Sequence, residues 1–451
     1  MHGGSTTLTN RILSGRAVVV GASIAGLFAA RALSDFVQGV VVLDGESLDT
    51  GFAPRKAVPQ GNHIHAILPP AYQSLKRLLP GVIDKLLADG AHLFDGGRDI
   101  KWKHLGHWLV RGKTGQTFIG ATRPFFEYHL RQHVESLDNV TILSGHRLLE
   151  WKMDPSRERV LGVVVQGPEK QRELDSELTV DARGSGSTLP KELIQLGFPK
   201  PETEVVEVDL TYTSCLCTAP EFSPDWNLLL MDPDAPKKWK GGILERVEAD
   251  RWIVTLWGYF GARAPTDDVG FRAYAESLDE PDIGEFLALA EPVSEYKQYR
   301  IPKCHLHRFD RLKRFPDRLL VVGDAVCKLN PIYGQGMTKA AKEGFFLWEL
   351  LSQVTENGSD LSGFSDQFRR KMGNVGAHWA WQLTSGSDLA YPQARGNRPL
   401  NLNFINWYVS RLFARAETKL EVRKALMDAM GLVKPPESIM RPSLILRALG
   451  F

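Results

Sequence analysis

The stretch RAVVVGASIAGLFAARAL, residues 16–33, decides the fold. It begins with a short β-branched run, continues through a turn between Gly21 and Gly26, and ends in good helix formers. Such an apolar run before a glycine turn is typical of a buried parallel strand. The next apolar run, GVVVLD, predicts a second strand that ends in Asp44. This β-α-β order with a terminal acid predicts a dinucleotide-binding fingerprint, and the acid favours an unphosphorylated ribose, as in FAD or NAD.

The turn itself has one departure from that fingerprint. Gly21 permits the tight turn, and Gly26 lets the helix pack closely on the strand. Ser23 stands where a middle glycine is usual. Its small hydroxyl could bond a phosphate, although the backbone approaches a ligand less freely than at glycine. The N–H groups at the helix start would then face a pyrophosphate.

Composition narrows the class of protein. A chain of 451 residues predicts two or more lobes, and 43% hydrophobic with 24% charged residues is ordinary for a globular protein. The net charge of +2 does not predict a nucleic-acid partner. Four cysteines are too few for a disulfide scaffold, so a reducing, cytoplasmic compartment is expected. Cys215 and Cys217 should share one face of a strand as packed side chains rather than as a metal or redox pair. No apolar run is long enough for a membrane span.

A second glycine-rich loop follows another buried strand, about 300 residues later in the chain. The run DRLLVV leads into Gly323 and Asp324, and then into NPIYGQGM and a helix-forming segment. Gly334 and Gly336 expose backbone that could touch a planar ligand. A reduced flavin ring gathers negative charge, which N–H groups at a helix start stabilise without a titrating side chain. The loop is therefore predicted to hold a flavin.

The segment PRKAVPQGNHIHAIL, residues 54–68, allows two interpretations. Its basic pair, Arg55 and Lys56, could meet a phosphate or a polar part of a cofactor, or could be a solvated loop. His63 and His65 would share one face of a strand. No third ligand stands at a recognisable spacing, so a metal site is not predicted.

Together these motifs resemble the FAD-dependent monooxygenases of the para-hydroxybenzoate hydroxylase type. The resemblance is carried by GASIAG, by DARGSGS at residues 181–187 and by GDAVCKLNP at residues 323–331. The 54–68 segment, RPFFEYHLRQHV from Arg123 and the C-terminal tail are most similar to the bacterial polyene epoxidases of polyether biosynthesis, with squalene epoxidases more distant. Thr188 stands where that subgroup usually has a basic residue, and Arg183 comes earlier.

The resemblance implies an α/β fold with a Rossmann-type FAD-binding domain, a mixed β-sheet substrate domain and a helical C-terminal segment. The expected boundaries are 1–80, 118–190 and 300–385 for the FAD-binding domain, 81–117 and 191–299 for the substrate domain, and 386–451 for the helical segment.

The resemblance also implies a set of cofactor contacts but no catalytic residue apart from the flavin. Arg55, Tyr333 and Gln335 would lie on the flavin side, and no metal is expected. The residues expected to bind FAD are Gly21, Ser23, Ile24, Ala25, Gly26, Asp44, Arg55, Lys56, Arg123, Asp181, Gly323, Asp324, Pro331, Gly334, Gln335, Gly336 and Met337.

The activity implied by the resemblance is monooxygenation. NADH or NADPH would reduce FAD, O2 would be trapped as a flavin C4a-hydroperoxide, and one oxygen atom would epoxidise or hydroxylate a lipophilic secondary metabolite. Candidate substrates are a polyene, an isoprenoid or a prenylated aromatic or quinoline. The alternatives are a polyprenyl reductase or dehydrogenase, a flavin-binding protein without catalysis, and a flavin halogenase, although the halogenase stretch W-x-W-x-I-P is absent.

Two further segments are predicted from pattern alone. GGILERVEADRWIVTLWGYFG, residues 241–261, should form two strands joined by a turn at residues 248–250, with one face in the core and the other toward substrate. Residues 404–430 are predicted to be helical. The aromatic C-terminal part either packs on the fold or makes a peripheral membrane contact.

Overall fold

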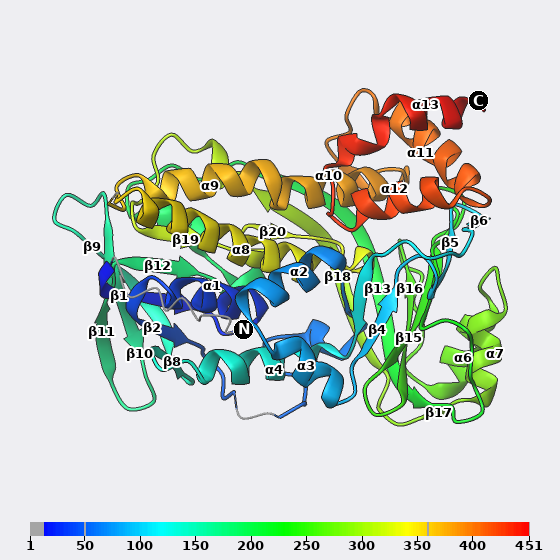
Figure 1. The fold of residues 1–451 in the computed structure, drawn as a ribbon, viewed down its shortest axis with the longest axis horizontal. Coiled ribbons are helices and arrows are strands. Elements are labelled where there is room, and N and C mark those ends of the chain that lie inside the picture. Colours follow the sequence, from blue (N-terminus) through cyan, green and yellow to red (C-terminus); the bar gives the residue numbers. More distant parts are fainter. Residues whose placement is uncertain (1–12, 49–50, 359, 451) are drawn as a thin grey trace, which may run out of the picture.

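The computed structural model describes residues 13–48, 51–358 and 360–450. Its first layer is a parallel sheet in the order β19-β12-β1-β2-β8 (Figure 1). The register pairs Val20 of β1 with Leu43 of β2 and with Asp181 of β12, so these strands end at one edge. The predicted β-α-β unit is therefore present. The five strands are Leu13–Val20 (β1), Val37–Leu43 (β2), Val140–Leu143 (β8), Leu178–Asp181 (β12) and Leu319–Val321 (β19).

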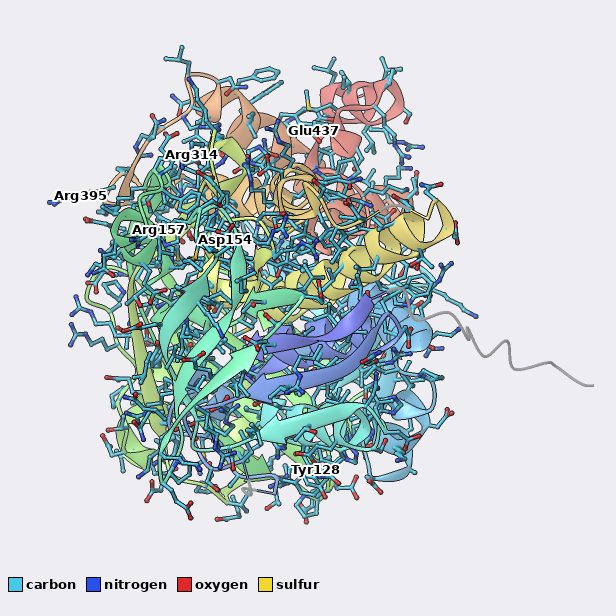
Figure 2. The ribbon with its side chains drawn as sticks, turned by 90° about the vertical axis from the view of Figure 1, so that its left-hand side faces the viewer. Tyr128, Asp154, Arg157, Arg314, Arg395 and Glu437 are labelled. Carbon is cyan, nitrogen blue, oxygen red and sulfur yellow. The ribbon has the colours of Figure 1, made fainter. Side chains whose placement is uncertain are left out.

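Both faces of this sheet are covered, which explains why the second half of β1, residues 17–20, is apolar. Ala17 and Val19 point into a core shared with helices, and Val18 and Val20 point into a core on the opposite face. The opposite face carries a three-stranded antiparallel sheet at the end of the molecule seen in Figure 2, where Asp154 and Arg157 mark the first turn. The helices are Ile24–Ser34 (α1), Pro69–Leu78 (α2), Val82–Ala88 (α3), Arg123–Glu135 (α4), Leu189–Gln195 (α5) and Gln335–Glu356 (α8), and the small sheet contains Arg147–Met153 (β9), Val160–Gln166 (β10) and Gln171–Asp175 (β11).

A ten-stranded, mostly antiparallel sheet forms the second lobe. The predicted hairpin is confirmed, because β15 and β16 pair across a turn at residues 248–250. Cys215 and Cys217 lie on one face of β13 with their Sγ atoms 4.0 Å apart, as predicted. The strands are Ile100–His104 (β5), His107–Trp108 (β6), Thr203–Thr218 (β13), Leu228–Met231 (β14), Lys240–Val247 (β15), Arg251–Gly258 (β16), Glu291–Pro292 (β17), Lys297–His307 (β18), Cys327–Lys328 (β20) and Arg395–Gly396 (β21).

Two smaller units complete this lobe. Two outer helices, α6 and α7, pack their apolar sides on the ten-stranded sheet, in a core that contains Trp252, Leu256, Phe271 and Phe286. A short antiparallel sheet in the order β3-β7-β4 links the lobes. The outer helices are Asp268–Glu276 (α6) and Asp282–Leu289 (α7), and the short strands are Ala66–Ile67 (β3), His92–Asp95 (β4) and Thr117–Gly120 (β7). His63 and His65 precede β3 and lie outside any strand, so the prediction that they share one face of a strand is wrong.

The C-terminal part is helical and covers both lobes along one side (Figure 1). The single helix predicted over residues 404–430 is instead two helices, since Lys419 is extended at φ −117° and ψ 100°. This break lets α12 fold back on α11. None of the described helices is long and apolar enough to cross a lipid bilayer. The helices are Phe364–Val375 (α9), Ala377–Asp388 (α10), Leu402–Ala416 (α11), Leu420–Met430 (α12) and Pro442–Leu449 (α13).

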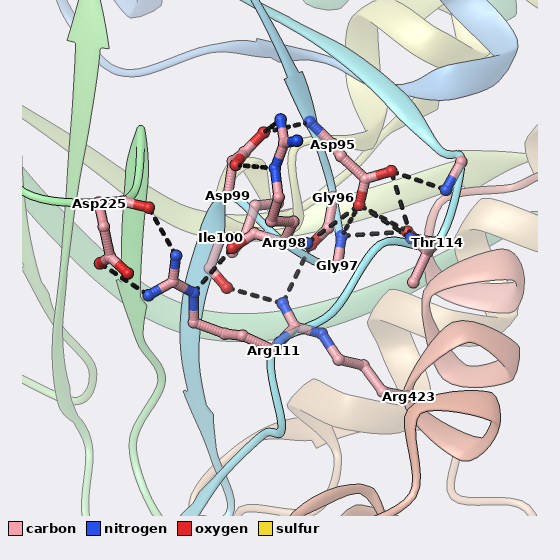
Figure 3. A network of polar contacts seen from close by, with 11 residues as sticks. Asp95, Gly96, Gly97, Arg98, Asp99, Ile100, Arg111, Thr114, Asp225 and Arg423 are labelled. Carbon is pink, nitrogen blue, oxygen red and sulfur yellow. Dashed lines mark hydrogen bonds and ion pairs between the residues drawn. The ribbon is translucent and has the colours of Figure 1, made fainter.

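A buried arginine attaches this helical layer to the ten-stranded sheet (Figure 3). Arg423 of α12 donates to the carbonyl oxygens of Gly96 and Ile100, at 3.0 and 2.7 Å, and to those of Leu109 and Val110, at 3.3 and 2.7 Å. Burial, together with nearby Arg111, lowers the pKa of Arg423 to about 10. The guanidinium therefore remains charged at neutral pH and satisfies four carbonyls of the loop around β5.

Candidate functional site

An open cleft lies where the ends of β1 and β12 meet the start of α8. It holds about 1790 Å³ of empty space, part of it open to solvent. Strand ends beside helix N-termini are the usual ligand position in α/β sheets. The two predicted loops, far apart in sequence, converge here. The predicted residues that line the cleft are Gly21, Ser23, Ile24, Ala25, Asp44, Arg55, Arg123, Gly323, Asp324, Pro331, Gly334, Gly336 and Met337.

The N-terminus of α1 is left free for a ligand. Ser23 is the N-cap residue, but its hydroxyl does not cap the helix. It donates instead to Oε2 of Glu127 at 3.0 Å and accepts from Arg123 at 3.1 Å. The first N–H groups of a helix have no partner within the helix. Those of α1 point at the cleft and suit a pyrophosphate.

Gly26 serves packing rather than ligand contact. A Cβ atom on Gly26 would lie 1.8 Å from the carbonyl oxygen of Gly21, which is backbone and cannot turn aside. Gly21 has φ +115°, a conformation that favours glycine. These two glycines fix how closely α1 approaches the end of β1, as the sequence predicted.

A buried charge cluster forms the wall beside α1. The Arg55 guanidinium lies 2.7 Å from Oδ2 of Asp44 and 2.8 Å from Oε1 of Glu127. Burial opposes the charge of Arg55, but these two carboxylates outweigh it and raise its pKa. Asp44 also accepts the N–H of Ala22 at 2.9 Å. The acid at the end of β2 is thus held in place, with its carboxylate at the cleft.

His65 and Arg123 face the same cleft. Nδ1 of His65 lies 2.9 Å from the carbonyl oxygen of His63, so Nδ1 carries the proton. Nε2 is then an acceptor that faces the Arg123 guanidinium at 3.5 Å. Burial, with Arg123 nearby, lowers the pKa of His65 to about 3. His65 is therefore neutral at any physiological pH.

The start of α8 forms the opposite wall. Gly334, at φ +66°, is the N-cap and provides no side-chain cap. Gly336 has no atom within 4 Å of the position that a Cβ would take. The N–H of Gly323 donates to Glu343 of α8 at 2.5 Å, which fixes the turn before Asp324. The backbone at this helix start is therefore open to the cleft, with the exposure that a bound flavin would need.

Besides Gly26, three residues that were expected to contact FAD lie elsewhere. Lys56 is exposed on the surface. Asp181 is fully buried and pairs with Arg183 at 2.8 Å, which holds the turn of the middle motif. The Gln335 side chain turns away from the cleft and donates to the carbonyl oxygen of Met430 at 2.7 Å. Contacts between these side chains and FAD stay predictions, as do those of the lining residues.

Tyr333 and two missed residues complete the site. The Tyr333 hydroxyl donates to Asp388 at 3.1 Å, so it does not point freely into the cleft. Glu127 and Glu343 were not predicted, although they hold Ser23, Arg55 and Gly323 in place. Glu127 follows Arg123 by one helical turn, and this i, i+4 spacing was the available signal.

The cleft fits a dinucleotide with a flavin. Two uncapped helix starts face it from opposite walls, and its glycines leave space that a Cβ would fill. The wall near α1 suits the pyrophosphate and ribose, and the start of α8 suits the flavin ring.

Comparison with known proteins bears on the class of protein to which the chain belongs. No family model matches the chain. Protein Rv3254 of Mycobacterium tuberculosis is 30% identical over 389 residues, which cover 84% of this chain and 81% of that protein. The 6-hydroxy-3-succinoylpyridine 3-monooxygenase HspB of Pseudomonas putida is 24% identical, over 79% of this chain and 84% of that protein. The chain belongs to the FAD-dependent monooxygenases of the para-hydroxybenzoate hydroxylase type. As an FAD-dependent monooxygenase it uses FAD and a nicotinamide reductant.

Solved structures show the same fold for this FAD-dependent monooxygenase. The p-nitrophenol 4-monooxygenase PnpA of Pseudomonas putida superposes with a TM-score of 0.63 at 17% identity, over 93% of this chain and 98% of that one. The flavin-dependent brominase Bmp2 superposes with a TM-score of 0.66 at 15% identity, over 96% and 97%. At this identity the likeness concerns the fold alone, and the substrate must be argued from the site.

Proposed function

We propose that this monooxygenase epoxidises or hydroxylates a lipophilic secondary metabolite such as a polyene, an isoprenoid or a prenylated aromatic. The observation that carries the proposal is an apolar wall beside the cleft. Tyr212 of β13 lines the cleft. Tyr212 pairs with Trp257 of β16, so both residues lie on the face of the ten-stranded sheet that is turned toward the cleft. Across this face lie Ile243 and Leu230, which pair directly and remain only half-buried.

The loop Asn330–Gly334, which precedes α8 and is called the cofactor loop below, approaches the same wall. Ile332 of this loop is also half-buried and packs in the core to which Leu230 and Ile243 contribute. Half-buried aliphatic side chains from two lobes offer an apolar substrate the contact that such ligands require. We therefore place the apolar body of the substrate between the loop and the sheet.

A neutral polar relay marks one edge of this wall. Nδ1 of His63 lies 2.7 Å from the Ser214 hydroxyl, which lies 2.6 Å from the Thr255 hydroxyl. Burial lowers the pKa of His63 to about 3, so no charge resides there. These groups can orient one polar group of the substrate while the apolar wall holds the remainder.

The chain's own residues bind, orient and exclude water. When bound, FAD supplies the activation of O2 that oxygen transfer requires. The uncapped start of α8 would hold the flavin ring, the wall near α1 would hold the pyrophosphate, and Asp324 would hold the ribityl chain. The apolar wall would keep water away, which protects a reactive oxygen species from wasteful release.

The helical layer supports the proposal of a peripheral membrane contact. Phe404 and Trp407 of α11 are 55% and 49% exposed, and Leu446 and Leu449 of α13 are 52% and 51% exposed. Arg441 begins the segment that carries the two leucines. Pelleting with anionic liposomes tests the contact, because Trp407→Ser with Leu446→Ser should then leave the protein in the supernatant. Pelleting that is equal with and without these substitutions would contradict it.

Labelled oxygen tests the proposed reaction. With NADH or NADPH and ¹⁸O2, lipophilic candidates should gain one ¹⁸O atom. Turnover without O2 would indicate a reductase instead, and a product that depends on bromide or chloride would indicate a halogenase. Ile243→Trp should abolish product formation while leaving bound FAD unchanged. Leu289→Trp, on the outer face at 53% exposure, is the matched control and should leave both unchanged.

A further inference from the structure

A buried carboxyl connects the cofactor loop to the helical layer and to the ten-stranded sheet. Asp388 ends α10 and is 1% exposed. Its Oδ1 atom accepts from Nδ2 of Asn330 at 2.8 Å, from the Tyr333 hydroxyl at 3.1 Å and from the Tyr259 hydroxyl at 3.4 Å. Asn330 also donates to the Tyr259 hydroxyl at 3.1 Å. One oxygen atom therefore collects donors from the loop and from the end of β16.

No cation balances this carboxyl among the described residues. Its three partners are neutral donors, and none of the described ion pairs includes Asp388. The titratable groups that interact electrostatically with it are weak acids: Tyr259 after β16, Tyr333 in the loop, Cys304 on β18, and Tyr391 after α10, with Asp232 after β14 close to Tyr333 and Tyr391. Burial raises the pKa of Asp388 to about 7, although the three donors act in the opposite direction.

The hydrogen bonds of Asp388 hold both ends of one short loop segment. Asn330 precedes the turn Pro331–Tyr333, which Gly334 connects to α8. Pro331 and Gly334 line the cleft. Asn330 and Tyr333 both reach the same Asp388 oxygen, so the carboxyl fixes the segment that sets the position of the α8 N-terminus. A charged acceptor strengthens such bonds about twofold over a neutral one.

We propose that Asp388 is a positioning residue for the loop Asn330–Gly334, and that its ionised form favours FAD binding. Protonation weakens the acceptor shared by Asn330 and Tyr333, which loosens the loop at the start of α8. FAD affinity should then fall as the pH is lowered through neutrality. The inference rests on the placement of FAD proposed above.

The test is a titration of apo-protein with FAD, followed by flavin fluorescence between pH 5.5 and pH 8.5. If one proton controls binding, the wild-type affinity should fall by up to about tenfold from pH 8 to pH 6. Asp388→Asn keeps the shape of the side chain but cannot ionise, and its affinity should not change over this range. The matched control is Asp428→Asn, a second buried carboxyl of the helical layer, which is paired with Lys424 and Lys434. The control should retain the wild-type pH dependence.

The outcomes separate this inference from the placement of FAD. An unchanged pH dependence in Asp388→Asn would overturn the role of Asp388 while leaving the FAD site intact. Wild-type protein that binds no FAD at any pH would instead contradict the site itself. If Asp388→Asn fails to fold, as judged by circular dichroism, Tyr333→Phe decides. The loss of one donor should move the midpoint to higher pH, and an unmoved midpoint would overturn the inference.

Discussion

Replacing Gly336 by alanine should change stability and cofactor affinity in opposite directions. Gly336 is the second residue of α8, its φ is not in the left-handed region, and a Cβ there would meet no atom within 4 Å. Alanine at a compatible helical position stabilises a protein by about 0.4–1 kcal/mol, mainly through the unfolded state. For 451 residues with an unfolding entropy of about 2.1 cal/mol/K each, the apo-protein midpoint should rise by only about 0.5–1 °C.

The same methyl group would occupy space that we assign to the flavin. Overpacking a close contact costs about 1–3 kcal/mol. FAD affinity should therefore fall by roughly 5- to 150-fold. Fluorescence titration of apo-protein measures the affinity, and calorimetry measures the midpoint.

A second glycine provides the matched control. Gly386 of α10 is also helical, also has open space at its Cβ position, and does not line the cleft. Gly386→Ala should give a similar small stabilisation without any loss of FAD affinity. Equal FAD affinities for Gly336→Ala, Gly386→Ala and wild type would refute the placement of FAD against the start of α8.

Three further predictions concern packing, the charge cluster and pH. Gly26→Ala should unfold at lower temperature and retain little FAD, because its Cβ would lie 1.8 Å from the Gly21 carbonyl oxygen; a wild-type melting curve would contradict this. Glu127→Gln should weaken FAD binding by roughly 1–3 kcal/mol because Arg55 and Ser23 lose a charged partner, whereas Glu135→Gln at the end of the same helix should bind FAD like wild type. The pKa of Asp388 is about 7 in the folded protein, above its ordinary value of 3.8, so the folded protein keeps the carboxyl proton up to a higher pH than the unfolded chain does. Its ionisation therefore removes stability as the pH rises from about 4 through 7, so Asp388→Asn apo-protein should gain more stability over wild type at pH 8 than at pH 5, and an equal difference at both would refute the assignment.

Much of the fold could be predicted because its signals are local. The run AVVV, the glycine turn and Asp44 lie within one β-α-β unit, and Gly334 directly precedes the helix that it opens. The hairpin of β15 and β16 followed from two runs of strand-forming residues on either side of a polar turn. Such features depend on neighbours in sequence, so residue type and spacing suffice.

The remaining parts of the site depend on distant residues. Glu127 bonds Ser23, which is 104 positions earlier, and Asp388 gathers donors that are 55 to 129 positions away. The direction of Gln335 depends on a carbonyl of α12, and no local pattern specifies it. The break in the helix predicted over residues 404–430 falls at Lys419, one turn before Arg423, which reaches the carbonyls around β5 from α12. These contacts exist only once the layers have packed.

The most direct test of the central claim is an experimental structure of the FAD complex. We predict that the pyrophosphate lies at the start of α1, that the adenosine ribose lies beside Asp44, and that the flavin ring lies against the backbone of Gly334 and Gly336. A flavin bound away from the α8 start, with these glycines facing solvent, would contradict it.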